Sequence, residues 1–426
     1  MDSDILVVGG GILGFSSAYH LKKQNPGKRV VIIDKNSGPG QGNTAKSEGA
    51  FRNVFASNTN YLLSDSTIDN LTYFQNKLGY DLKIDRIGYL WLFNEEQFNR
   101  IRSVYENMKR NGIELITLGK EELKSAIPDL VTEFSDDEDA KLMGIEPIDV
   151  GLLAPKCGSV DADILCKAYE SEFLKIGGET VYNTEAKRLL IKPKEELGLT
   201  GEPFIWQKKV IAGVETNKGE IKAETTIVAI GTWAEGLLNP VGLESMIRPK
   251  KRQLFVFKDS KLTGLMNTKG LNKSGALPLT ILPNSGVYLK SEKSEGSIWL
   301  GCADNIGRKF ELEEEPMPEE EYYTNNIYYV LCKYFPCFNN LRPSNMWAGQ
   351  YDINSLDMTP IVEQYPGMIY VGAASGSGIM KSDSIGRIVA ARFIGEEDAE
   401  LFGGRRFHVA DIGINERNVA KETFVI

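Results

Sequence analysis

The chain opens with two apolar runs separated by one amphipathic segment. The first run, DILVV (Asp4–Val8), is short and continuously apolar, which predicts a buried strand. The second, RVVIID (Arg29–Asp34), predicts another strand. Between them, ILGFSSAYHLKK predicts a helix whose apolar positions are Ile12, Leu13, Phe15, Ala18, Tyr19 and Leu21. This strand-helix-strand order is that of a βαβ unit with a parallel sheet.

Further along the chain, helical and strand patterns continue without an internal repeat. The segment EQFNRIRSVYENMKRNG (96–112) predicts a helix that ends at Asn111-Gly112 and turns Phe98, Ile101, Tyr105 and Met108 to one side. Apolar runs predict strands at Gly88–Phe93, Gly286–Lys290 and Ser297–Cys302.

Glycines at a fixed spacing join the first strand to the first helix. Gly9, Gly11 and Gly14 form a G-x-G-x-x-G motif, and Asp34 ends the second strand twenty residues after Gly14. Gly9 allows a tight turn, Gly11 lets a pyrophosphate approach the backbone, and Gly14 lets the helix pack on the strand. Asp34 can accept a hydrogen bond from an adenosine ribose, which disfavours a 2′-phosphate. We therefore predict adenine dinucleotide binding.

Three later loops suit a long cofactor that lies across one sheet. The first, KNSGPGQGNTAKSEGAFRN, is rich in Gly, Ser and Thr and carries Lys46 and Arg52. The second follows a predicted strand (Thr226–Ile230) in IVAIGTWAEGLL, and the third is SGSGIMKSDSIGR (Ser375–Arg387). The third loop feeds a helix, so its backbone N–H groups form a site for negative charge.

Bulk properties narrow the class of protein. A length of 426 residues favours two domains, and 42% apolar with 25% charged residues is typical of a soluble globular protein. The net charge of −9 argues against nucleic acid and anionic membranes as partners. No apolar run approaches the roughly 20 residues of a membrane span, and the N-terminus does not resemble a signal peptide.

Few other residues in the sequence are candidates for a catalytic or metal-binding role. Five scattered cysteines predict reduced thiols, a cytoplasmic location and no metal site, with Cys332 and Cys337 packed in the core. The only histidines, His20 and His408, are expected to be structural. Seven glutamates between Glu311 and Glu321 predict a solvated loop without a function.

The motifs together resemble the FAD-dependent D-amino-acid oxidase superfamily, in its sarcosine oxidase and glycine oxidase branch. The N-terminal motif, GSVDADIL (Gly158–Leu165), AIGTWA (Ala229–Ala234) and SGSGIMKSDSIGR carry this likeness in order along nearly the whole chain. GNTAKSEGAFR, RPKKRQLF (Arg248–Phe255), ADNIGRKFELEEEP and WAGQYDI (Trp347–Ile353) look more like archaeal dye-linked L-proline dehydrogenases.

The resemblance implies an α/β fold of two domains. A Rossmann-like FAD-binding domain would comprise 1–86, 157–235 and 346–403. A mainly antiparallel substrate domain would comprise 87–156 and 236–345, with a tail at 404–426. The second glycine loop would lie at the flavin ring, with the helix after Met380 pointing its positive N-terminus at the reduced ring. The implied cofactor contacts are Gly9, Gly11, Ile12, Leu13, Gly14, Asp34, Lys35, Asn43, Thr44, Ala45, Lys46, Ser47, Ala186, Gly231, Trp233, Gly349, Tyr351, Ser375, Gly376, Ser377, Gly378, Ile379, Met380 and Lys381.

Four residues are implied at the substrate: Arg52, Tyr288, Trp299 and Lys381. Arg52 aligns with the carboxylate-binding arginine of the sarcosine oxidases, and a guanidinium can hold a carboxylate by two hydrogen bonds. Their carboxylate-binding lysine falls on Met380, one residue before Lys381. Trp299 replaces a lysine that promotes reaction with oxygen, so another acceptor is expected.

The implied activity is an FAD-dependent amino-acid dehydrogenase. The cysteine that tethers flavin in sarcosine oxidases falls on Gly349, so FAD is expected to bind non-covalently. The scarcity of histidine as a base favours an amine, with L-proline as the first choice, over a hydroxy acid. Electrons would pass to a quinone, a dye-like acceptor or a protein carrier.

Several alternatives stay open. They are a sarcosine or dimethylglycine dehydrogenase, a 2-hydroxy-acid dehydrogenase and a non-catalytic FAD-holding subunit. The oligomeric state is also open. The apolar residues at the end of the chain, Phe424 among them, are expected to dock near the substrate entrance or on a partner subunit.

Overall fold

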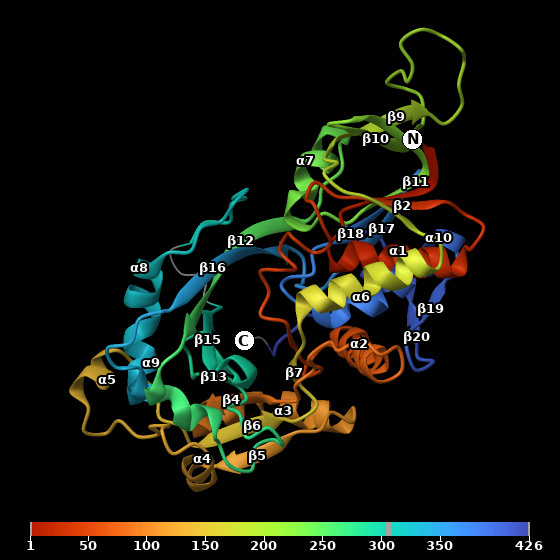
Figure 1. Cartoon of the computed structure of the whole chain (residues 1–426). Helices are drawn as coiled ribbons and strands as arrows, with labels where there is room; N and C mark the ends of the chain where they lie inside the picture. The colour runs from red at the N-terminus through yellow and green to blue at the C-terminus, as the bar shows by residue number, and fades with distance from the viewer. Residues whose placement is uncertain (1, 304–307, 425–426) are drawn as a thin grey trace.

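The computed structural model describes residues 2–303 and 308–424, and most of its strands belong to two eight-stranded sheets (Figure 1). The first sheet has the order β17-β18-β11-β1-β2-β8, with β10 and β9 added beside β11. All neighbours from β18 to β8 are parallel. Its strands are β1 (Asp2–Val8), β2 (Val30–Ile33), β8 (Glu179–Val181), β9 (Ala186–Pro193), β10 (Lys209–Thr216), β11 (Gly219–Val228), β17 (Ile361–Tyr365) and β18 (Met368–Gly372).

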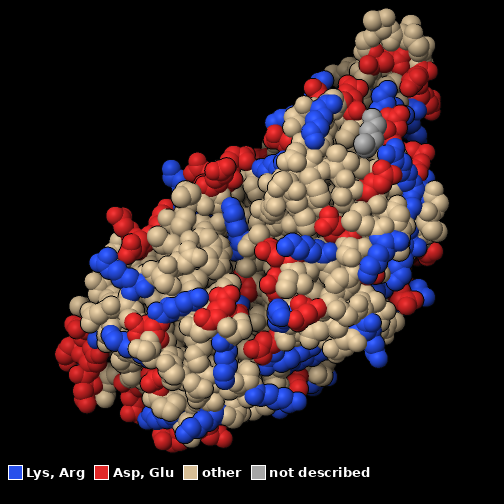
Figure 2. Space-filling view, in the orientation of Figure 1, with Lys and Arg blue, Asp and Glu red and all other residues tan. Residues whose placement is uncertain are grey.

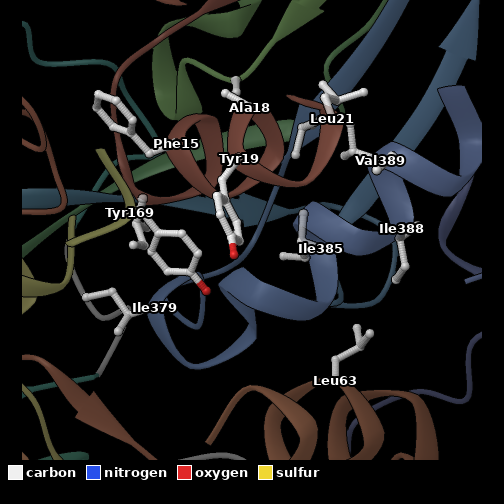
Figure 3. Packing of buried hydrophobic residues seen from close by; sticks show 14 of the residues in the cluster. Phe15, Ala18, Tyr19, Leu21, Leu63, Tyr169, Ile379, Ile385, Ile388 and Val389 are labelled. Atoms are coloured by element: carbon white, nitrogen blue, oxygen red, sulfur yellow. The ribbon is translucent and has the colours of Figure 1, made fainter. Parts of the chain in front are cut away.

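Helices cover the parallel part of this sheet. They are α1 (Ile12–Gln24), α2 (Asn58–Asn76), α6 (Ala162–Lys175) and α10 (Ser382–Ile394). Figure 3 shows Phe15, Ala18 and Leu21 of α1 in one cluster with Ile385, Ile388 and Val389 of α10, Tyr169 of α6 and Leu63 of α2. Burying an apolar side chain of this size contributes about 1.5–3 kcal/mol. The helix predicted after the first glycine loop is confirmed.

A buried polar group also joins α1 to α10. His20 Nε2 lies 2.7 Å from Asp383 Oδ1, and Arg387 Nε donates to Asp383 Oδ2 at 2.6 Å. Burial lowers the pKa of His20. His408 lies half-exposed, 3.3 Å from Asp398. Both histidines thus make contacts within the fold.

The second sheet has the order β16-β12-β15-β14-β13-β4-β6-β5. Every neighbouring pair is antiparallel except β4 and β13, so a mainly antiparallel sheet is observed as expected. Its strands are β4 (Tyr89–Phe93), β5 (Ile116–Gly119), β6 (Val150–Ala154), β12 (Ile247–Phe257), β13 (Leu279–Ile281), β14 (Val287–Glu292), β15 (Ser297–Cys302) and β16 (Asn345–Asn354). The strands predicted at 88–93, 286–290 and 297–302 correspond to β4, β14 and β15.

Shorter elements complete the described chain. The predicted helix at 96–112 is α3 (Glu95–Arg110), capped by Asn94 and Gln97. The other helices are α4 (Lys120–Ala126), α5 (Glu138–Leu142), α7 (Ala234–Leu238), α8 (Glu320–Tyr322) and α9 (Tyr328–Tyr334). Two short ladders pair β3 (Ala50–Phe51) with β7 (Gly158–Ser159) and β19 (Asp398–Glu400) with β20 (Arg406–His408).

The expected domain boundary at 346 differs from the sheet pairing. From Asn345 to Asn354, β16 pairs with β12 and therefore belongs to the second sheet. The chain returns to the first sheet at β17. The sequence of β16 alone could not show which sheet it joins, because a strand pairs through the backbone groups along its edges, which do not depend on its side chains.

Three further observations concern the surface charges, the cysteines and the hydropathy of the helices. Figure 2 shows Lys and Arg interspersed with Asp and Glu over the visible face. No disulfide joins the five cysteines, all of which lie in the described part of the chain. Among the residues described, no helix combines the length and hydropathy that a membrane crossing requires.

Candidate functional site

A cavity of about 820 Å³ opens where the two sheets meet. Its lining includes Val8 and Ile33 at the carboxyl ends of β1 and β2, and it includes Leu254, Tyr288 and Tyr351 from the second sheet. Ligands of open α/β sheets bind at the carboxyl ends of the parallel strands. The volume lies in the upper part of the range for ligand cavities, about 300–1,000 Å³.

The three glycines of the first loop differ in what surrounds them. A Cβ on Gly9 would lie 2.4 Å from Ala229 O, and one on Gly14 would lie 1.8 Å from Gly9 O. A Cβ on Gly11 would meet only Thr44 Oγ1, at 3.4 Å, and Gly11 lines the cavity. Gly9 and Gly14 therefore allow close packing of the protein itself, whereas Gly11 faces space that a ligand can fill.

Asp34 ends β2 at the cavity wall. Its Oδ2 accepts from Gly10 N at 2.6 Å, and its Oδ1 accepts from Asn36 N at 2.7 Å. The carboxylate is thereby held in one orientation. Each oxygen keeps a further acceptor position, which is the capacity that a ribose hydroxyl requires.

The acidic run after residue 310 covers part of the cavity. Glu314 accepts from Trp233 Nε1 at 2.7 Å and lies 3.5 Å from Lys35 Nζ, which stands 4.2 Å above the Trp233 ring. Phe310, Leu312 and Glu314 all line the cavity. The run is solvent-exposed as expected, since six of its seven glutamates are exposed, but Glu314 also makes a contact with Trp233 and Lys35 that the charge pattern did not predict. Charge counting could not reveal it, because the contact depends on distant residues.

The second glycine loop lies against Asp352 of β16. Backbone φ is positive at Ala373, Ser375 and Gly376, and a Cβ on Gly376 would lie 2.3 Å from the Tyr351 ring. Asp352 Oδ2 accepts from Ala374 N at 3.0 Å. Burial raises the pKa of Asp352 to about 6, although these backbone donors oppose the shift. The loop leads into a 3-10 turn, Ile379–Lys381, and then into α10.

The cavity brings together most of the residues that the resemblance assigned to the cofactor. Those that line it are Gly9, Gly11, Ile12, Leu13, Asp34, Lys35, Asn43, Thr44, Lys46, Ser47, Ala186, Gly231, Trp233, Gly349, Tyr351, Ser375, Gly376, Ser377, Gly378, Ile379 and Met380. Gly14, Ala45 and Lys381 do not line it. Gly14 packs on Gly9, and Ala45 N donates to Gly40 O at 2.9 Å.

Arg52 also lines the cavity and is buried. Its Nη1 donates to Val54 O at 2.5 Å and to Phe424 O at 3.4 Å, and the guanidinium stands 4.1 Å from the Phe55 ring. Burial lowers the pKa of Arg52. Among residues 2–303 and 308–424, Arg52 forms no ion pair. The Glu422 carboxylate acts on this charge without forming an ion pair with it. A buried cation that lacks a direct ion pair favours an anionic ligand, because a poorly compensated buried charge is costly.

Of the other residues expected at the substrate, only Tyr288 lines the cavity. The Trp299 ring packs edge-on against Trp347 with centroids 4.9 Å apart. Lys381 Nζ donates to Asn60 Oδ1 at 2.8 Å and to Ser377 Oγ at 2.7 Å. Burial, and then the nearby Arg52 charge, lower the pKa of Lys381 to about 7. The structure therefore places Trp299 and Lys381 behind the cavity wall.

Glu48 is a cavity residue that the sequence reasoning missed. Its Oε2 is buried and has no hydrogen-bond partner, and the side chain lines the cavity. Burial raises the pKa of Glu48 to about 7, although the Lys290 ammonium opposes the shift. Glu48 lies four residues before Arg52, on the other side of the short strand β3, and this proximity in sequence is the signal that could have pointed to it. An unpartnered carboxyl in a cavity is a candidate proton acceptor.

Comparisons with known proteins agree with this geometry. The family model described as FAD dependent oxidoreductase (DAO) matches residues 4–392. FAD-dependent oxidoreductase domain-containing protein 1 of Xenopus laevis is 24% identical over 425 residues, which cover 91% of this chain and 78% of that protein. L-2-hydroxyglutarate dehydrogenase of Escherichia coli is 26% identical over 307 residues, covering 70% of this chain and 63% of that one.

Solved structures show the same architecture. L-proline dehydrogenase from P. horikoshii superposes with a TM-score of 0.73 at 23% identity, and the match covers 92% of this chain and 93% of that chain. The predicted α/β fold of two domains is thereby confirmed.

Proposed function

This chain belongs to the DAO family of FAD-dependent oxidoreductases, and from that premise we propose that it dehydrogenates the α-carbon of a small carboxylate, with L-proline as the favoured substrate. Family membership makes FAD the cofactor, and the comparisons together indicate an oxidoreductase of the amino-acid or hydroxy-acid dehydrogenase type. The substrate and the residues assigned to it are the proposal.

The residues that would hold FAD follow from the cavity wall. Gly11 leaves room for the pyrophosphate, and Asp34 offers acceptors to the ribose. Gly376 to Met380 would lie beside the ring, where the first turn of a helix presents unpaired N–H groups. Since glycine stands at position 349, we expect this FAD to be non-covalent. When bound, FAD supplies the acceptor of the hydride that leaves the substrate α-carbon.

The observation that carries the substrate class is the buried, unpaired guanidinium of Arg52. It lines the cavity beside Phe55 and Tyr89, so an anionic group with a small apolar body would fit there. Among the described contacts, only Nη1 of Arg52 is engaged. The Nε and Nη2 edge can therefore receive the two oxygens of a carboxylate.

Glu48 is the residue that would accept the proton that the substrate releases. The α-carbon loses one hydrogen as hydride, and the other hydrogen leaves the substrate nitrogen or hydroxyl as a proton, which goes to the Glu48 carboxylate. For an amino acid the product is an imine. Because Glu48 can serve as a base, the scarcity of histidine no longer argues against a hydroxy acid. L-2-hydroxyglutarate dehydrogenase among the relatives keeps that class as the second candidate.

The electron acceptor depends on the surroundings of Trp299. Lys290, paired with Trp299 across β14 and β15, holds its ammonium 4.5 Å above that ring and donates to Glu48 O at 2.6 Å. A lysine is thus present next to Glu48, but Lys290 does not line the cavity, and its ammonium lies 3.6 Å from Glu292. We therefore keep the expectation of slow reaction with oxygen, now on the ground that Lys290 is not among the residues that line the cavity.

Arg52→Ala tests the substrate site. Its loss should weaken apparent substrate binding by about 2–4 kcal/mol, because the carboxylate loses a charged hydrogen-bonded partner. The measurement is the concentration dependence of anaerobic flavin reduction, with Arg110→Ala on the exposed face of α3 as the control. Normal flavin content with an unchanged concentration dependence would contradict the assignment, and loss of flavin would move Arg52 to the cofactor.

A further inference from the structure

Residues 308–314, called the clasp here, run from the second sheet to the loops that follow β2 and β11. Lys250 Nζ of β12 donates to Arg308 O. Gln350 Nε2 of β16 donates to Glu311 O at 3.1 Å. These two bonds fasten the start of the clasp to the second sheet. In Figure 1, the chain just before α8 extends from this sheet towards α7, the next α-helix after β11.

Glu314 fastens the end of the clasp to the domain of the first sheet. It accepts from Trp233 Nε1 at 2.7 Å and lies 3.5 Å from Lys35 Nζ. Trp233 follows β11, and Lys35 is next to Asp34, whose carboxylate we assign to the adenosine ribose. The cavity lining includes Glu314, Trp233, Lys35 and Asp34. The clasp therefore reaches the adenosine end of the FAD site.

Alternate residues of the clasp line the cavity. Phe310, Leu312 and Glu314 line it, whereas Glu311 and Glu313 do not. Extended backbone gives this pattern, because successive side chains point to opposite sides. Phe310 is 51% exposed and Leu312 is 37% exposed. A ligand that fills the cavity would remove both side chains from water, which is favourable for apolar groups.

We propose that the clasp is a further part of the FAD site, in which Leu312 covers the adenosine half of the cofactor and Glu314 holds the clasp in place. None of the cofactor contacts implied by the sequence motifs lies in residues 308–314. The contacts of the clasp with FAD are lost when FAD leaves, so the clasp slows its release. The inference uses the cofactor of the family and does not depend on the proposed substrate.

Release of FAD from the holoprotein tests the clasp without turnover, with the fluorescence of free FAD after dilution as the measurement. In Leu312→Ala the release rate should rise about tenfold, because an apolar contact with the cofactor is lost. In Glu314→Gln it should rise about threefold, because an exposed ion pair contributes little. Met317→Ala and Glu315→Gln are the matched controls, since both residues are exposed on the same run and neither lines the cavity. Both controls should release FAD at the wild-type rate.

Hydrogen exchange shows whether FAD covers the clasp. The amides of residues 308–314 should exchange more slowly in the FAD-loaded protein than in the flavin-free protein. Equal exchange in the two forms, or wild-type release rates in both Leu312→Ala and Glu314→Gln, would overturn the proposal. The same acceleration in the controls would also overturn it, because the effect would then not depend on the cavity. Melting of the flavin-free variants identifies any that fail to fold, and the exchange of the wild type then decides the question.

Discussion

Glu48 and Arg52 flank the short strand β3, and burial shifts their pKa values in opposite directions. Burial raises the pKa of Glu48 to about 7 and lowers that of Arg52, because both charged forms lose solvation. Glu48 accordingly changes protonation near neutrality while Arg52 remains a cation. A base and a carboxylate anchor can thus act in the same cavity at the same pH.

This difference predicts a pH dependence of anaerobic flavin reduction. Below its raised pKa, Glu48 is protonated and cannot accept a proton, so the rate should rise as the pH increases through about 7. Glu48→Gln should remove this limb and lower the rate by about 10²–10⁴-fold. Lys381 also has a pKa of about 7, so Lys381→Met is the matched control and should keep the limb. A profile that is unchanged in Glu48→Gln and lost in Lys381→Met would contradict the assignment.

The raised pKa of Glu48 also determines how the stability of the fold depends on pH. Since the folded-state pKa of Glu48 is raised above its ordinary value of 4.5, the folded state binds the proton more tightly than the unfolded state. The associated stability is present below pH 4.5 and is lost as the pH rises through about 7.

Two glycines near the turn between β1 and α1 have different roles: Gly14 packs against the protein backbone, and Gly11 faces the cavity. Gly11→Val should fold and melt like the ligand-free wild type but contain no flavin, because only Thr44 Oγ1 lies near the new Cβ while the cavity is filled. Gly14→Ala should lower the melting temperature even without flavin, because its Cβ would overlap Gly9 O. Flavin absorbance and thermal melting measure the two effects. A fully yellow Gly11→Val protein would refute the phosphate assignment.

The local pattern predicted these elements well because their signals lie within single segments. Gly9, Gly11, Gly14 and Asp34 belong to one βαβ unit, whose spacing fixes their places. By contrast, β16 could not be assigned to a sheet from its own sequence, since its membership is decided by pairing with β12. Glu48 was missed because its burial depends on residues from the other sheet.

Contacts between residues that are far apart in the sequence could not be predicted from local patterns. Docking of the last residues near the substrate end was anticipated, but the residues that receive them were not. Glu422 bonds to Ser57, and the Phe424 carbonyl meets Arg52, across more than 360 positions. The acidic run is exposed as expected, but the contacts of Glu314 with Trp233 and Lys35 span 81 and 279 positions and could not be read from the run itself. The cavity thus forms only when both sheets and the segment that carries Lys421 and Glu422 are assembled.

Anaerobic flavin bleaching tests the central claim most directly. The yellow holoprotein is mixed without oxygen with L-proline, with L-2-hydroxyglutarate as the comparison, and the reduced protein is then exposed to air or to a dye. We predict that L-proline bleaches the flavin, that the hydroxy acid does so poorly, and that the dye restores the colour faster than air. No bleaching by any small amino or hydroxy acid would contradict a catalytic role and leave the chain as an FAD-holding protein.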